Sequence, residues 1–168
     1  MGFPMDTSLS AWNNYFMAVA GATAGLAGLL VVSLSINLKP ILAIRGMAAR
    51  AGETFMPLGV LLILSLMALN PLENERGLAW GCLLLGGLVW LATVWMQIGA
   101  FRARHFQKAH HFAIRVGLLQ PATLCVPLAG ALMLAGHPDG LGWFGVAIGF
   151  SFASAMVNAW IMLVEIVR

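Results

Sequence analysis

The chain has 168 residues, of which 61% are hydrophobic and 9% are charged, and its mean hydropathy is +0.91. Soluble domains carry about a quarter charged residues, so this chain has too few polar groups to cover a surface that faces water. The composition excludes a soluble globular domain and predicts one domain embedded in lipid. The net charge of +3 alone would suit nucleic-acid binding. The basic residues lie between apolar runs, however, so we expect no nucleic acid partner.

Five apolar runs are long enough to cross the hydrocarbon core, which needs about 20 residues in a helix. The predicted spans are residues 9–38, 54–72, 77–101, 114–136 and 141–166. The first is expected to be retained, because no basic residue precedes it as in a signal peptide. None of the runs alternates in polarity as a barrel strand does. The sequence therefore predicts an all-α bundle of five transmembrane helices in a single domain, residues 1–168.

The connections between the spans predict how the bundle is oriented. Tight turns at Asn70-Pro71 and at residues 136–140 predict two antiparallel hairpins. With five spans, one side of the membrane holds eight basic residues: Lys39, Arg45, Arg50, Arg102, Arg104, Lys108, Arg115 and Arg168. The other side holds Asp6, Glu73, Glu75, Arg76 and Asp139. Because basic loops stay in the cytoplasm, we expect the N-terminus outside and the C-terminus inside a bacterial inner membrane.

Small residues recur at helical spacing along the first span. The residues of this row are Asn14, Ala18, Gly21, Gly25, Gly28, Val32, Ser35 and Lys39. Small side chains let helices approach closely within a membrane. The sequence therefore predicts a packing or oligomer face centred on Gly21, Gly25, Gly28 and Ser35. It leaves open whether the partner is another helix of the same chain or a second subunit.

Polar residues form stripes on two other spans. The fifth span carries Ser151, Ser154, Asn158 and Glu165, and the third carries Gly86, Trp90, Thr93 and Gln97. Polar groups that face lipid are costly, so these side chains are expected to face protein or water. Either they form hydrogen bonds between helices, or they line a narrow hydrated passage.

The third connection, residues 101–112, is the most polar part of the chain. If it is helical, Arg104, Lys108, His111 and Arg115 share one face, and such a face suits anionic lipid headgroups on the cytoplasmic side. Its three histidines, His105, His110 and His111, include no pair at four-residue spacing. We therefore expect no metal site here.

Ionisable residues are absent from the middle of every predicted span. Glu53 stands at the start of the second span, where a carboxylate is favoured by the helix dipole. Glu53 and Glu165 are alternatively expected to form an acidic ring at a pore mouth, if the protein is a symmetric oligomer. No catalytic motif and no pair of acids on one face occurs. We therefore expect neither catalysis nor a cofactor.

The stretch from Val19 to Leu38 combines a Gly/Ala-rich run with a Leu-Ser-Ile-Asn-Leu ending, and a basic connection follows it. This segment resembles small bacterial multi-span inner-membrane proteins, some of which are labelled modulators of a membrane-bound protease. The resemblance covers the first two predicted helices. It implies a bacterial inner-membrane protein and assigns no functional residues.

Three functions follow from these patterns. The first is a homo-oligomeric channel or pore-forming subunit, favoured by polar stripes without charge at the midplane. The second is an accessory, regulatory or assembly subunit that docks on a larger membrane complex through the glycine face of the first helix. The third, an enzyme acting on lipid, has only Glu53, Glu165 and the loop histidines to draw on. We expect the channel.

Overall fold

A computed structural model of the whole chain describes residues 9–43, 47–72, 74–102 and 109–167. For residues 9–10, 40, 109–112 and 161–167 only the backbone is described. Five helices in these ranges are long and apolar enough to cross a membrane: α1 (Asn13–Ile36), α3 (Met47–Ala68), α4 (Glu75–Arg102), α5 (Ala109–Leu134) and α6 (Gly140–Val167). A 3₁₀ helix η1 (Leu9–Trp12) and a short helix α2 (Leu38–Ala43) complete the described secondary structure, which includes no strand. The predicted all-α fold with five spans is confirmed.

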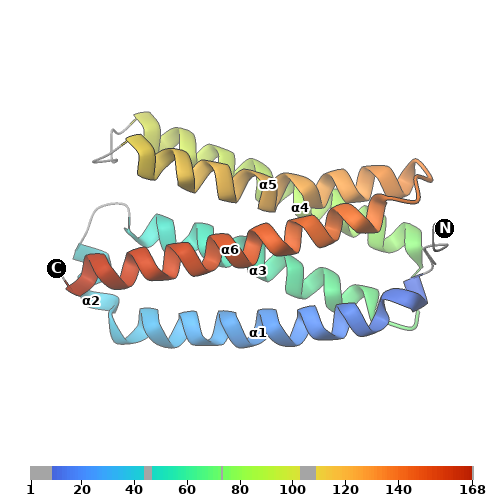
Figure 1. Cartoon of the computed structure of the whole chain (residues 1–168), viewed down its shortest axis with the longest axis horizontal. Helices are drawn as coiled ribbons and strands as arrows, with labels where there is room; N and C mark the ends of the chain where they lie inside the picture. The colour runs from blue at the N-terminus through green and yellow to red at the C-terminus, as the bar shows by residue number, and fades with distance from the viewer. Residues whose placement is uncertain (1–8, 44–46, 73, 103–108, 168) are drawn as a thin grey trace, which may run out of the picture.

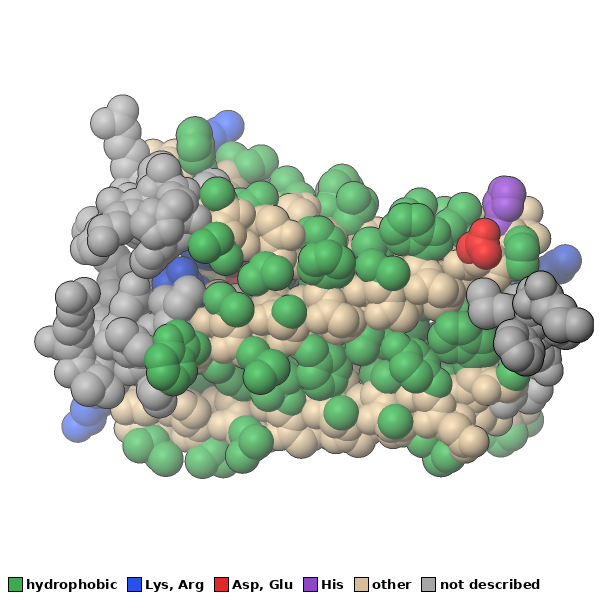
Figure 2. Space-filling view, viewed as in Figure 1, with side chains coloured by type: hydrophobic (Ala, Val, Ile, Leu, Met, Phe, Trp, Pro, Cys, Tyr) green, Lys and Arg blue, Asp and Glu red, His purple; other side chains and the backbone are tan. Residues whose placement is uncertain are grey.

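The five long helices lie along one common axis, and consecutive spans run in opposite directions (Figure 1). α3 packs against α1, α4 and α6, and α5 packs between α4 and α6. Hydrophobic side chains cover the length of the visible face, and charged side chains appear only near its two ends (Figure 2). This distribution is the one expected for a bundle whose middle is surrounded by lipid.

The described charges distinguish the two ends of the bundle. Lys39, Arg50, Arg102 and Arg115 lie toward the end where α1 and α6 finish, which we call the basic end. Glu75, Arg76 and Asp139 lie at the opposite end, which we call the acidic end. The predicted separation of charge along the chain is therefore present in the folded bundle.

Both turns at the acidic end are closed by local hydrogen bonds. The Asn74 side chain accepts a bond of 2.8 Å from the Gly77 amide, so that Asn74 caps the start of α4. At the end of α5, Gly136 has φ 74°, a left-handed conformation that glycine adopts without strain. The His137 amide bonds to the Leu132 carbonyl and the Gly136 amide to the Met133 carbonyl, which is a Schellman motif. The α3–α4 and α5–α6 pairs are the antiparallel hairpins that the turn residues predicted.

Two helices begin earlier than the predicted spans. α3 begins at Met47 rather than at 54, and α5 begins at Ala109 rather than at 114. The predicted bounds followed runs without charge, whereas the helices continue through Arg50, Glu53 and Arg115 because helix formation tolerates charged side chains. α5 also continues through Pro121 and Pro127.

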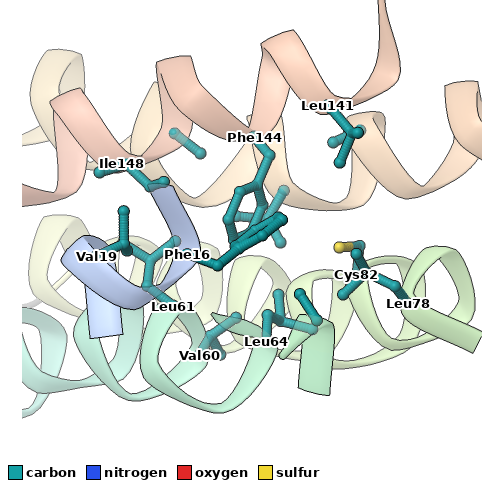
Figure 3. Packing of buried hydrophobic residues seen from close by; sticks show 14 of the residues in the cluster. Phe16, Val19, Val60, Leu61, Leu64, Leu78, Cys82, Leu141, Phe144 and Ile148 are labelled. Carbon is teal, nitrogen blue, oxygen red and sulfur yellow. The ribbon is translucent and has the colours of Figure 1, made fainter. Parts of the chain in front are cut away.

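The half of the bundle toward the acidic end contains the main hydrophobic core (Figure 3). Phe16 of α1 and Phe144 of α6 are fully buried, with ring centroids 5.5 Å apart, and Leu61 and Leu64 of α3 pack beside them. The same half contains glycines that let helices touch. A Cβ atom on Gly130 would lie 2.6 Å from the Ala79 carbonyl oxygen, so α5 can approach α4 only because this residue has no side chain.

Candidate functional site

An ion pair lies inside the half of the bundle toward the basic end and joins α3 to α5. Glu53 is fully buried, and the Arg115 side chain is 13% exposed. The Arg115 Nε–H donates to Glu53 Oε2 at 2.7 Å, and Arg115 Nη2 lies 2.5 Å from Glu53 Oε1. The guanidinium thus lies against both carboxylate oxygens and donates a charge-assisted hydrogen bond to Oε2. The charge of Arg50, on the preceding turn of α3, also acts on this carboxylate.

The ion pair changes the expected roles of both residues. Glu53 was expected at a helix start or in an acidic ring, but its carboxylate is enclosed within one chain and bound to Arg115. Arg115 was grouped with headgroup-binding residues, but its guanidinium points into the bundle toward α3. The side chains of the other three members of that group, Arg104, Lys108 and His111, lie outside the described part of the chain.

A second group of polar side chains joins α4 to α5. The indole N–H of Trp90 donates to Gln120 Oε1 at 2.9 Å, and the Gln120 amide donates to Gln97 Oε1 at 2.7 Å. Gln97 is 6% exposed, and its Nε2 has no hydrogen-bond partner among the described residues. Thr93 is fully buried, and its hydroxyl donates to the Trp90 carbonyl at 2.8 Å within α4. The stripe predicted on this helix therefore faces α5.

The stripe predicted on α6 is also inside the bundle. Ser151, Ser154 and Asn158 are all buried. Ser151 is 1% exposed, and its hydroxyl has no hydrogen-bond partner among the residues described. Ala159, next to Asn158, packs in a cluster with Phe55 of α3, so Asn158 lies at nearly the same level as Glu53. The Glu165 side chain lies outside the described residues.

Gln97 lies at that same level. A Cβ atom on Gly52 of α3 would lie 3.8 Å from the terminal methyl of Met96 in α4, and these residues directly precede Glu53 and Gln97. The ion pair, the amide chain and the α6 stripe thus occupy one half of the bundle. We call the nine residues concerned the polar half: Glu53, Trp90, Thr93, Gln97, Arg115, Gln120, Ser151, Ser154 and Asn158.

The small-residue face of α1 is uncovered. Gly21, Gly25, Gly28 and Ser35 are exposed, and a Cβ atom on any of the three glycines would have no neighbour within 4 Å. The helix buries its other side, with Phe16 and Thr23 fully enclosed. The prediction that this face packs against another helix of the same chain was therefore wrong. The other predicted partner, a second chain, stays a prediction.

Sequence reasoning missed one residue of the site, Gln120, and one pairing, that of Glu53 with Arg115. Gln120 was passed over although it is a polar amide within an apolar span, and such a residue needs a partner in lipid. The partnership of Glu53 with Arg115 had no local signal, because 62 positions separate them in the chain. Among the described residues no group of three His, Cys, Asp or Glu side chains is placed to hold a metal ion.

Comparisons of the chain with family models, curated proteins and solved structures find no match. The polar half is the part of the described structure that bears most directly on function. Its groups supply hydrogen-bond donors and acceptors, two of them without a protein partner among the described residues, and one buried pair of opposite charges. Such a set can bind water or a small polar solute and can hold helices together.

Proposed function

We propose that this chain is a channel-type membrane protein whose solute path enters the interior of each protomer from the basic end. One observation carries the proposal: polar side chains from four spans are gathered inside a single bundle, including Gln97 and Asn158. Buried polar and ionisable groups within a membrane commonly mark substrate or ion pathways. Two of these groups have unpartnered polar atoms, which favours hydration of this half.

The outer surface of the bundle favours this internal path over a pore between subunits. The large exposed side chains on the outer faces of α4 and α6 are apolar: Leu84, Leu88, Leu91, Trp95, Ile98, Met156 and Trp160. A pore formed between such faces would be lined by hydrocarbon. The expected homo-oligomeric channel is therefore proposed here with one path in each protomer.

The apolar half is proposed to be the gate. Phe16, Leu61, Leu64 and Phe144 fill the interior beyond the polar half. A hydrophobic constriction stops conduction by excluding water. Conduction in this proposal requires these side chains to separate. The path is therefore closed in the present conformation.

The arrangement in the cell is part of the same proposal. The basic end is placed in the cytoplasm of a bacterium, with the N-terminus outside, because Lys39, Arg50 and Arg102 lie toward one end of the folded bundle. Basic side chains there would contact anionic headgroups. The exposed glycine face of α1 suits a neighbouring copy of the chain.

Solute flux through proteoliposomes tests the channel proposal. Asn158→Leu replaces a buried amide in the polar half with an apolar side chain and is expected to reduce flux at least tenfold. Val157→Leu is the matched control, because Val157 is the adjacent residue of α6 and is 36% exposed. Equal flux in the two variants and the parent protein would refute an internal path along α6.

A second candidate function is favoured by the uncovered face of α1. Gly21, Gly25 and Gly28 can receive a helix of a different protein, which would make this chain an accessory or assembly subunit. Mass measurement of the complex extracted from native membranes distinguishes the two functions. Assemblies of one chain support the channel, whereas a fixed stoichiometry with another protein, lost in Gly25→Leu, supports the accessory subunit.

A further inference from the structure

We propose that the polar half binds a small monovalent anion of the size of chloride, with the carboxamide N–H of Gln97 as a ligand. This inference deepens the proposed function, because it names the class of solute that the internal path takes. It rests on the direction of the hydrogen-bond chain between α4 and α5 and on the distribution of charge at the basic end.

Trp90 fixes the direction of the hydrogen-bond chain. An indole nitrogen only donates, so the atom of Gln120 that receives its bond at 2.9 Å is the carbonyl oxygen. The amide nitrogen of Gln120 then points to Gln97, which has to present its own oxygen at 2.7 Å. Neither amide can be flipped without placing two donors or two acceptors together. The chain therefore ends in the NH₂ group of Gln97.

This terminal NH₂ group needs an acceptor. Gln97 is 6% exposed, and its Nε2 has no partner among the described residues. A buried donor without an acceptor is costly, so a bound molecule that supplies one is favoured.

The surrounding charges favour an anion over a cation. Both oxygens of Glu53 are engaged by Arg115, so the carboxylate is already neutralised and is a poor ligand for a cation. Lys39 and Arg102 add positive charge toward the same end, and Glu53 is the one acid there whose side chain is described. A surplus of one sign concentrates ions of the other sign at the entrance. A single charge is favoured because amide and hydroxyl donors cannot offset the desolvation of a multiply charged ion.

Thermal unfolding of the purified, detergent-solubilised protein tests the binding. The probe is sodium chloride, compared with sodium gluconate at equal concentration, because gluconate is too large for the interior of the bundle. An anion that binds the folded state raises Tm by mass action. We expect saturating chloride to raise Tm by about 2–4 °C relative to gluconate.

Gln97→Met keeps the length of the side chain, removes the donor, and is expected to abolish the difference between the two salts. Ser35→Ala is the control, because Ser35 is exposed on α1 and its hydroxyl bonds within its own helix. Equal Tm in both salts for the parent protein would mean that water alone satisfies Gln97, and it would overturn the proposal. So would a chloride effect that persists in Gln97→Met.

If Gln97→Met shows no cooperative unfolding, Gln97→Asn takes its place, because it keeps the carboxamide but withdraws the donor by one carbon. A chloride effect in the parent that Gln97→Asn weakens supports the site, and one that Gln97→Asn leaves unchanged overturns it. Chloride binding in a protein that conducts nothing would refute the channel and leave the anion site. Conduction of a neutral solute without any chloride effect on Tm would refute the anion site and leave the channel.

Discussion

The two halves of the bundle are built from the same helices but are held together differently. In the half toward the acidic end, Phe16 and Phe144 meet in an apolar core, and Gly130 lets α5 touch α4. In the half toward the basic end, two smaller apolar clusters, around Met47 and around Leu58, are accompanied by the Glu53–Arg115 pair and the amide chain. One continuous apolar core stabilises the first half, and small apolar clusters together with polar bonds stabilise the other.

This difference matches the arrangement of the ribbons. Figure 1 shows the α4–α5 pair close to α6 near the acidic end and farther from it near the basic end. The ion pair joins α3 to α5 where the helices separate. Apolar packing there is divided between two small clusters, and the two charged side chains add a link between α3 and α5.

Loss of the ion pair is expected to have the largest effect. Arg115→Gln leaves a buried carboxylate without its partner and should cost about 3–5 kcal/mol of the free energy of unfolding. Unfolding in mixed micelles with increasing SDS measures this change. The double variant Glu53→Gln with Arg115→Gln should recover more than half of the loss. A double variant as unstable as Arg115→Gln would show that the charges themselves are not what holds the polar half.

Overpacking of the apolar half should have the next largest effect. Gly130→Ala places a methyl group against backbone atoms of Ala79 and Leu83, each at 2.6 Å, and should cost about 1–3 kcal/mol. Gly117→Ala is the matched control in the same helix, since no atom lies within 4 Å of the added carbon. It should be neutral or stabilise by up to about 1 kcal/mol. Equal effects of the two substitutions in the same SDS titration would abolish the contrast between the halves.

A smaller effect is expected from the amide chain. Trp90→Phe keeps an aromatic ring but removes the indole donor, leaving the Gln120 carbonyl without its bond, and should cost about 1 kcal/mol. Hydrogen exchange or SDS unfolding measures the loss. Trp95→Phe, whose side chain is 78% exposed on the same helix, is the control and should change stability by less than about 0.5 kcal/mol. A larger loss of stability in Trp95→Phe than in Trp90→Phe would contradict the prediction that the Trp90 hydrogen bond stabilises the bundle.

The smallest effect on the protomer is expected on the outer face of α1. Gly25→Leu adds a side chain where no atom lies within 4 Å, so the stability of the single chain should change by less than about 0.5 kcal/mol. The same substitution should weaken association with a neighbouring chain. Crosslinking in native membranes measures association, with Leu88→Ala, on the exposed surface of α4, as a control. Loss of protomer stability without loss of association would contradict both expectations.

Much of the fold follows from the order of residues along the chain. Long apolar runs predict spans, and the Asn74 cap, Asn70-Pro71 and the 136–140 turn end them through local backbone chemistry. The start of α3 was missed because a charged residue was taken as a boundary. Glu53 could be buried inside the bundle because Arg115, in a distant helix, binds its carboxylate. Span length is local information, and the neutralisation of a charge is not.

The candidate site divides in the same way. Helical spacing placed Thr93 with Gln97 and Ser151 with Asn158 on common faces, and this required only the periodicity of the helix. Periodicity alone could not distinguish whether a small-residue face looks inward or outward. The structure buries the polar stripes and leaves Gly21, Gly25 and Gly28 exposed, because Phe16, Thr23 and Leu30 on the other side of α1 are the residues that pack into the bundle.

By itself, the sequence determined the lipid environment, the five helices, their hairpins and the separation of charge between the two ends, because each depends on composition and near-neighbour spacing. The tertiary structure decided which faces meet, that Glu53 and Arg115 form a pair, and that polar groups occupy one half of the interior. Those outcomes depend on contacts between residues far apart in the chain. Their energies become defined only when the helices are packed.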